Sequence, residues 1–350
     1  MKNNASLTNI LNIELPVIQA PMAGAQGSDM AIAVSEAGGL GSLPCAMLTI
    51  DGMQQALSAI EARTDKPINV NFFCHRLPRI DLQRQQQWLE KLTPYYREYG
   101  IDPASVSFVA GRAAFNRQMA DAIAGFRPQV VSFHFGLPEA ALLEQVKSWG
   151  AKVVSSATTV AEAIWLEQHG ADIIIAQGLE AGGHRGHFLS DDLNQQLPLA
   201  DLLPRVLQVV NLPVVAAGGI GSAADVARAI SLGAAGVQVG TAYLLCQESL
   251  ISDVHRAALT GPQATETALT NLFTGRPARG IINRFMQESG PLNDSVPDFP
   301  LATSAVMPLR SAAEKQQRGD FSPLWAGQNT TGCKAVSAAR LTRELAAALR

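Results

Sequence analysis

The chain has 350 residues, of which 47% are hydrophobic and only 16% are charged. A chain this apolar can bury enough surface to fold, which excludes intrinsic disorder, and no apolar run approaches the ~20 residues that a membrane-spanning helix needs. The net charge of −3 gives no electrostatic footprint for nucleic acid or for an anionic membrane. We therefore expect a soluble enzyme with a large core and neither kind of partner.

The cysteines and the N-terminus predict a cytoplasmic protein. Cys45, Cys74, Cys246 and Cys333 are far apart and form no CxxC pair, so we expect neither a zinc site nor any other metal. A core of this size needs no disulfides, and residues 1–16 lack the apolar segment of a secretory signal. Reduced thiols in the cytoplasm follow from both features.

Eight short apolar runs alternate with helical patterns along the first two thirds of the chain. Their apolarity is continuous, which is typical of strands that are covered on both faces of a parallel sheet. The runs are residues 16–21, 39–43, 68–73, 130–135, 152–156, 172–177, 212–217 and 235–240. Amphipathic helices are expected between them, for example over 51–63, 138–149, 159–169 and 222–232. Eight alternating strands and helices predict a (β/α)8 TIM barrel, and the strand count argues only moderately against a doubly wound open sheet.

We expect three parts in the chain. Residues 1–249 form the barrel, with an insertion at about 75–110 that contains a polar helix over 81–99. Residues 250–328 are rich in Gly, Pro, Ser and Thr and show no strand periodicity, so they are expected to form a small cap over the barrel mouth. Residues 329–350 contain a C-terminal helix that packs back on the barrel.

Polar residues end several of the predicted strands, where a TIM barrel builds its active site. They include Gln19, Asn71, His134, Gln177 and Gln238. Any one of them could simply anchor a loop, but several converging on one mouth predict a ligand with many hydrogen-bonding edges.

A glycine-rich turn follows the seventh strand. The run Gly219 to Ala224 is similar to a dinucleotide fingerprint, but it follows a late strand and the acidic residue that the fingerprint requires is missing. We expect instead a phosphate site in the loops after the seventh and eighth strands, where Gly218 and Gly219 bring backbone N–H groups close and Ser222 begins a helix. This arrangement predicts a phosphorylated cofactor and is also compatible with a plain strand-to-helix turn.

The segment 177–186 is the most specific stretch, with glycines at 178, 182, 183 and 186. Glycines this dense allow the backbone to approach a flat or bulky ligand. They surround His184, which can take up a proton or hydrogen-bond an anion and is the predicted catalytic residue. His134 is a second candidate. It ends a strand at the same barrel mouth and could contact the substrate directly or act through another residue.

The remaining charged and histidine residues receive simpler interpretations. Arg185 is a cation beside the predicted catalytic residue that could equally pair with surface carboxylates. His187 is expected to be structural or solvent-exposed, and His75, His169 and His255 are expected at the surface or at helix ends.

Taken together, these motifs resemble the nitronate monooxygenases of the class I type, formerly grouped as 2-nitropropane dioxygenases. The resemblance runs through QAPMAG at 19–24, NVNF at 69–72, SFHFG at 132–136, GGHRG at 182–186 and QVGT at 238–241. It implies an FMN-dependent barrel that oxidises alkyl nitronates, such as propionate 3-nitronate, with O2 to a carbonyl compound and nitrite through a flavosemiquinone. His184 would be the catalytic residue. The implied FMN contacts are Met22, Asn71, Gln177, Gly182, Gly219, Gln238, Val239, Gly240 and Thr241.

Two questions stay open at this point. Class members often carry tyrosines and a lysine in the cap, where this chain has Phe299, Thr303 and Met307, so the preferred substrate is unsettled. An NAD(P)H-dependent flavin reductase of the same superfamily, acting on quinones or enoyl-ACP, shares the EAGGH segment, and a non-catalytic binder of a phosphorylated ligand is a further alternative. The expected assembly is a monomer or a homodimer.

Overall fold

The computed structural model describes residues 6–109 and 111–349, so the outer ends of the predicted parts, at residues 1–5, 110 and 350, lie outside the described residues. All eight predicted strands are present and parallel, each within two residues of its predicted bounds. They are β1 (Val17–Gln19), β2 (Gly41–Pro44), β3 (Ile68–Phe73), β4 (Val130–His134), β5 (Lys152–Ala157), β6 (Ile173–Gln177), β8 (Val214–Ala217) and β9 (Gly236–Val239).

The sheet closes on itself. Its strand order is β1-β9-β8-β6-β5-β4-β3-β2, and a parallel bridge between Ile18 and Leu40 joins the two ends. There Leu40 N donates to Val17 O and Gln19 N donates to Leu40 O, each at 2.9 Å. An open sheet would leave β1 and β2 as edges, so this bridge confirms the TIM barrel and removes the open-sheet alternative.

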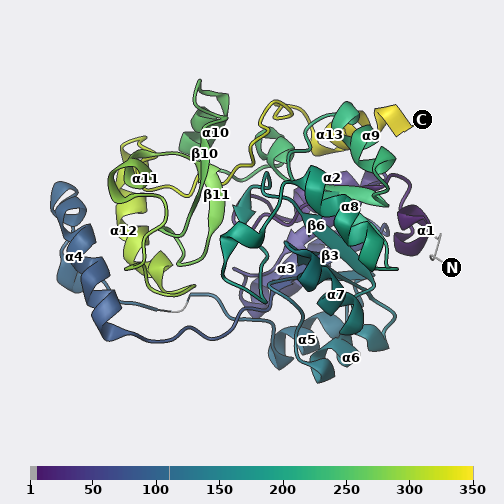
Figure 1. Cartoon of the computed structure of the whole chain (residues 1–350), viewed down its shortest axis with the longest axis horizontal. Coiled ribbons are helices and arrows are strands. Elements are labelled where there is room, and N and C mark those ends of the chain that lie inside the picture. Colours follow the sequence, from purple (N-terminus) through teal and green to yellow (C-terminus); the bar gives the residue numbers. More distant parts are fainter. Residues whose placement is uncertain (1–5, 110, 350) are drawn as a thin grey trace.

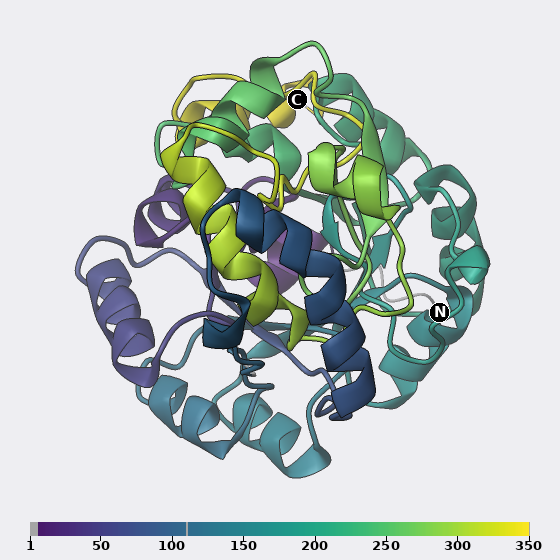
Figure 2. The same cartoon turned by 90° about the vertical axis from the view of Figure 1, so that its left-hand side faces the viewer.

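Seven helices form a ring around the strands (Figure 2). Several begin at a side chain that accepts a hydrogen bond from a backbone N–H of the first turn, as Thr49, Asn116, Thr159 and Ser222 do, which stabilises a helix start. The seven are α2 (Ser28–Glu36), α3 (Ile50–Glu61), α5 (Arg117–Ala124), α6 (Ala140–Ser148), α7 (Val160–Gln168), α8 (Leu199–Val209) and α9 (Ala223–Ser231).

The N-terminal end of the barrel is filled by α1 (Leu7–Leu11). Leu7 and Leu11 are buried in one cluster with Ile18, Val130 and Ile173 of the barrel strands. Because this end is packed with apolar side chains, the opposite end, where the strands finish, is the one left to bind a ligand.

That opposite end is covered by two segments far apart in sequence (Figures 1 and 2). One contains α4 (Leu82–Glu98) and η1 (Pro103–Ser105), and the other α10 (Asp253–Thr260), α11 (Arg284–Ser289) and α12 (Ala302–Lys315). Helices α4 and α12 lie side by side across the mouth. Trp88, Leu92 and Tyr96 of α4 are buried in the cluster they share with α12, and the Tyr96 hydroxyl donates to the Ala305 carbonyl at 2.6 Å.

Residues 250–328 contain two strands, although their sequence shows no strand periodicity. β10 (Thr267–Thr270) and β11 (Ala278–Ile281) pair antiparallel, and β11 also pairs with the two-residue β7 (Gly183–His184). Strands of four and two residues with mixed polarity are too short to show an alternation of polar and apolar side chains. Only their pairing with neighbouring strands in the structure identifies them.

Beyond the cap, the chain returns to the barrel. Helix α13 (Ala338–Leu345), followed by η4 (Ala347–Leu349), packs against α2 and α9, with Leu341 and Leu345 fully buried. Two further short turns are η2 (Leu193–Gln195) and η3 (Thr241–Leu245). Among the described residues, no helix combines the length and apolarity needed to cross a membrane.

The packing of α4 generates a stability prediction. Leu92→Ala should lower the free energy of unfolding by about 2–5 kcal/mol, because the side chain is fully buried and its loss leaves a cavity. Leu82→Ala is the matched control, since Leu82 lies on the same helix at 73% exposure and should change stability by less than about 0.5 kcal/mol. Urea unfolding followed by tryptophan fluorescence measures both, and equal effects would show that α4 does not contribute to the core.

Candidate active site

A cavity of about 430 Å³ lies between the strand ends and the cap, within the size range of pockets that bind small molecules and cofactors. The structure brings the predicted catalytic and cofactor-binding residues to this cavity, but not Gln19 or Ser222. Those that line it are Met22, Asn71, His134, Gln177, Gly182, His184, Gly218, Gly219, Gln238, Val239, Gly240 and Thr241.

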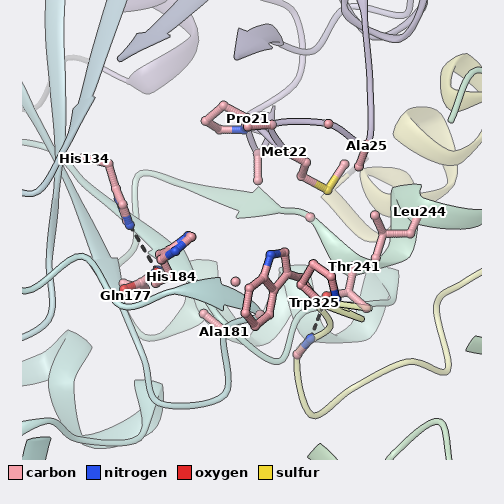
Figure 3. A pocket seen from close by; sticks show the side chains of 18 of the residues that line it. Pro21, Met22, Ala25, His134, Gln177, Ala181, His184, Thr241, Leu244 and Trp325 are labelled. Atoms are coloured by element: carbon pink, nitrogen blue, oxygen red, sulfur yellow. Dashed lines mark hydrogen bonds between the residues drawn. The ribbon is translucent and has the colours of Figure 1, made fainter. Parts of the chain in front are cut away.

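His184 enters the cavity from β7, which pairs with β11 (Figure 3). Its Nε2 lies 2.9 Å from the Thr274 hydroxyl oxygen, while no described residue forms a hydrogen bond with its Nδ1. Thr274 lies in the turn between β10 and β11. One ring nitrogen is therefore held by the cap, and the other is available to a ligand.

The His184 backbone is held by the barrel. His134 Nε2 and Gln177 Nε2 each lie 3.1 Å from the His184 carbonyl oxygen and donate to it, as the close approach of the two histidines in Figure 3 shows. The other His134 nitrogen, Nδ1, then accepts from the Ser156 hydroxyl at 3.2 Å. Gln177 Oε1 accepts from Gly186 N at 2.8 Å. Both ring nitrogens of His134 are thus engaged with protein groups.

Arg185 does not pair with surface carboxylates, and that expectation was wrong. Its side chain is fully buried and its guanidinium donates to Gln196 Oε1, Gly178 O and Gln177 O at 2.7, 2.8 and 3.0 Å. Burial lowers the pKa of Arg185 to about 9. The planar fork of an arginine suits three acceptors in one plane, so Arg185 ties the loop after β6 to the end of β6.

His184 is electrically neutral in this environment. Burial lowers its pKa well below the ordinary value of 6.5, and the positive charge of Arg112 is the next cause, followed by His134, Arg276 and His187. Burial likewise lowers the pKa of His134 to about 4. The two histidines are therefore uncharged at neutral pH, and the positive charge near them belongs to arginines.

Aromatic rings surround the His184 imidazole. The rings of Phe299, Trp325, Phe73 and Phe135 lie 5.4, 5.6, 6.1 and 6.1 Å from it, centroid to centroid. These rings restrict the imidazole and exclude water from one side of the cavity. Among the residues that line the cavity there is no tyrosine, so the cap of this chain offers no phenol hydroxyl to a ligand.

The residues after β8 and β9 fit a bound phosphate. Within the described chain, the backbone N–H groups of Gly219, Ile220, Gly240 and Thr241 donate to no protein acceptor, although all four residues line the cavity. Unpaired N–H groups that converge from neighbouring loops form an anion site. This supports the phosphate site predicted after the seventh and eighth strands.

Ser222 begins α9, as predicted, and accepts a hydrogen bond from Asp225 N. It is exposed and does not line the cavity, and the start of α9 already holds a carboxylate. Asp225 Oδ2 accepts from Gly221 N at 3.2 Å and from the Ser222 hydroxyl at 2.8 Å, and Asn329 Nδ2 lies 3.3 Å away. The unpaired N–H groups that face the cavity therefore belong to the loops and not to the start of α9.

The structure shows a packing reason for the glycine at position 182. A Cβ there would lie 2.5 Å from the Ala326 carbonyl carbon and from Gly327 N. Similarly, a Cβ on Gly332 would lie 2.2 Å from Gly221 O. Residues 326–332 therefore lie directly against both glycine loops, and Gly327 N donates to Thr241 Oγ1 at 2.9 Å (Figure 3).

Two of the histidines expected at the surface are buried. His75 is 7% and His255 is 8% exposed, and burial lowers the pKa of each to about 4. His255 lines the cavity because α10 belongs to the cap, which the sequence pattern did not resolve. His169 is exposed at the end of α7 as predicted, and His187 is buried and structural. Gln19 lies outside the cavity lining and hydrogen-bonds Gln26 and Ser42.

Sequence reasoning missed three residues of the site, namely Arg112, Thr274 and Trp325. Arg112 and Trp325 line the cavity, and Thr274 both lines it and contacts His184. They lie in segments without periodicity, so no sequence signal places them near His184. Across residues 6–109 and 111–349, no group of three or more His, Cys, Asp or Glu is placed to hold a metal ion.

Comparison with known proteins identifies the family. A family model described as nitronate monooxygenase matches residues 4–348. Proteins named nitronate monooxygenase from Paraburkholderia phytofirmans and Pseudomonas aeruginosa are 38% and 39% identical, covering 97% and 98% of this chain and 93% and 98% of theirs. The solved structure of a nitroalkane oxidase from Streptomyces ansochromogenes is 37% identical with a TM-score of 0.90, covering 99% of this chain and 98% of that one. The chain therefore belongs to the nitronate monooxygenase family, whose members are flavin-dependent oxidoreductases that oxidise nitronates.

Proposed function

We propose that this chain binds FMN and uses O2 to oxidise alkyl nitronates, such as propionate 3-nitronate, to a carbonyl compound and nitrite. The observation that carries the proposal is the unpartnered Nδ1 of a neutral His184, which faces the same cavity as the unpaired N–H groups of the phosphate site. We also propose a cytoplasmic enzyme that is a monomer or a homodimer.

The choice of FMN rests on the shape of the phosphate end. The N–H groups of Gly219, Ile220, Gly240 and Thr241 suit one phosphate. Residues 326–332 pack against the glycine loops at distances that leave no space for a Cβ, which favours a mononucleotide at this end of the cavity. Gly218, with φ of +121°, Met22, Asn71, Gln177, Gly182, Gln238 and Val239 would complete the contacts. When bound, FMN supplies a ring that accepts electrons from the substrate and passes them to O2.

His184 is assigned to the reacting atoms. When the Thr274 hydroxyl donates to Nε2, the imidazole presents Nδ1–H to the cavity, where a nitronate oxygen can accept it. When the hydroxyl accepts from Nε2–H, as its contact with the Arg276 carbonyl at 3.3 Å allows, Nδ1 presents a lone pair. That lone pair can take the α-proton of a neutral nitroalkane. Thr274 thus lets one neutral histidine serve either protonation state of the substrate.

His134 is assigned to positioning rather than to chemistry. Its Nε2–H fixes the His184 carbonyl and its Nδ1 is already occupied by Ser156, so it has no free nitrogen for substrate. Gln177 holds the same carbonyl from the next strand. Together the two side chains set the height of His184 above the strand ends.

We further propose that residues 250–328 act as a cap that completes the substrate pocket, with the insertion at about 75–110 as its outer support. The ion pair between Arg84 and Asp298, at 2.6 Å, joins the two segments. Trp325 and Thr274 of the cap reach the cavity, so substrate specificity would depend on this part of the chain.

The cofactor proposal predicts a yellow purified protein that releases FMN, and no FAD, on heat denaturation. Chromatography of the released flavin against both standards measures this. Mixed anaerobically with NADH or NADPH, the protein should stay oxidised, because a nitronate oxidase takes its electrons from the substrate. Rapid bleaching would favour the pyridine-nucleotide-dependent reductase, and a colourless protein would favour a non-catalytic binder.

His184→Asn should keep the flavin and lose nitronate turnover by about 10²-fold or more, since the residue acts on the reacting atoms. Oxygen uptake with propionate 3-nitronate measures the loss. His169→Gln is the matched control, because this histidine is exposed at the end of α7 and should leave turnover unchanged. Unaltered oxygen uptake by His184→Asn would refute the assigned role.

The lowered pKa of His184 has a measurable consequence. Desolvation and the charges of Arg112, Arg276, His134 and His187 disfavour the imidazolium, so in the flavin-free protein His184 should stay neutral at pH 6.5 and above and take up a proton only below it. NMR of histidine-labelled protein follows this titration, with His184→Asn identifying the signal. A protonation midpoint at or above 6.5 would contradict the expected direction.

A further inference from the structure

Arg112 lines the active-site cavity, and no described residue places a carboxylate within ion-pair distance of it. The cavity lining contains two arginines, Arg112 and Arg310, and Arg310 donates to Glu314 at 2.8 Å. The hydrogen bond formed by the Arg112 side chain goes to the thioether sulfur of Met47, at 3.7 Å, which is a weak acceptor. Glu180 is the acidic residue of the lining, and both its carboxylate oxygens are engaged by Leu199 N at 3.1 and 2.9 Å.

Arg112 is half-buried, which makes the lack of a charged partner unusual. Desolvation lowers the pKa of its guanidinium, and a cation that is partly withdrawn from water without a partner is destabilised. The neighbouring Arg276 offers no compensation, because it is itself positive, donates to the His187 carbonyl and lies 4.1 Å from the Phe135 ring centroid. The site therefore carries excess positive charge that an anionic ligand would balance.

Arg112 and His184 lie at the same end of the cavity. The Arg112 guanidinium carbon is 5.7 Å from the centroid of the Phe299 ring, and the His184 imidazole centroid is 5.4 Å from the same centroid. Arg112 is also the largest charged contributor to the lowered pKa of His184. The cation and the neutral imidazole therefore both lie close to the Phe299 ring.

We infer that Arg112 binds the two nitronate oxygens of the substrate and orients them beside His184. This rests on the proposed function. A nitronate group is planar with two negatively charged oxygens, like a carboxylate, and a guanidinium matches that geometry with two parallel N–H donors. Since His184 is uncharged, Arg112 supplies the positive charge that the nitronate requires, and His184 supplies the hydrogen bond or the proton acceptor.

The test compares Arg112→Gln, which removes the charge, with Arg112→Lys, which keeps a point charge. Arg112→Gln should raise KM about 10- to 100-fold for both ethyl nitronate and propionate 3-nitronate, with a smaller change in kcat, because a charged hydrogen-bonding partner is lost. Arg112→Lys should recover much of the loss. Arg76→Gln is the matched control, because Arg76 is an exposed arginine that also lies between β3 and α5, and it should change neither constant.

Nitrite binding separates this inference from the proposed function. Nitrite carries the same pair of oxygens and needs no turnover, so its dissociation constant from the resting flavoprotein, followed by flavin absorbance, should rise at least about tenfold in Arg112→Gln. A wild-type protein that oxidises no nitronate would refute the proposed function alone.

Three outcomes would overturn the role of Arg112. The first is equal nitrite affinity in wild type and Arg112→Gln. The second is an equal loss in the Gln and Lys variants, because charge would then not be the cause. The third is a defect confined to propionate 3-nitronate, since the arginine would then contact the remote carboxylate instead of the nitronate oxygens.

Discussion

The site depends on how the loop after β6 is held. Its backbone is fixed from the barrel side by Gln177 and His134, which both donate to the His184 carbonyl, and by the buried guanidinium of Arg185. From the cap side, β11 pairs with His184, and Arg185 N donates to Pro277 O at 2.9 Å. The same few residues therefore join the barrel to the cap and position the His184 imidazole. A shift of the cap relative to the barrel would move this imidazole as well.

This arrangement separates charge from proton chemistry. The histidines nearest the reacting position are neutral because they are buried among arginines, while the guanidinium groups retain their charge. A neutral imidazole can donate or accept a proton without first losing one, and a guanidinium can attract an anion without titrating. The low charged fraction of the chain is consistent with this division, since some of its few charges, such as Arg185 and Arg279, are buried beside the site.

The sequence predicted what local patterns determine. Continuous apolar runs marked all eight barrel strands, and the glycine cluster pointed to His184. Patterns could not show what a buried charge does, so Arg185 was misread as a residue that could face the surface. Patterns also could not show why a glycine is required at a given position. The sequence singled out Gly182, but only the structure shows that the backbone of residues 326–327 leaves no space for a Cβ there. Thr274 and Arg112 meet His184 only through tertiary packing of irregular segments.

The cap residues Phe299, Thr303 and Met307 make better sense with Arg112 in view. Phe299 has no hydroxyl to offer a substrate, but its ring contacts both Arg112 and His184, so it can orient polar groups that it does not itself supply. An aromatic face favours a guanidinium stacked near it, and a phenol in its place would compete for the same oxygens. The lack of tyrosines in the cavity lining is thus compatible with anion binding, because here the charged side chain of Arg112, from the segment between η1 and α5, takes over the polar contacts.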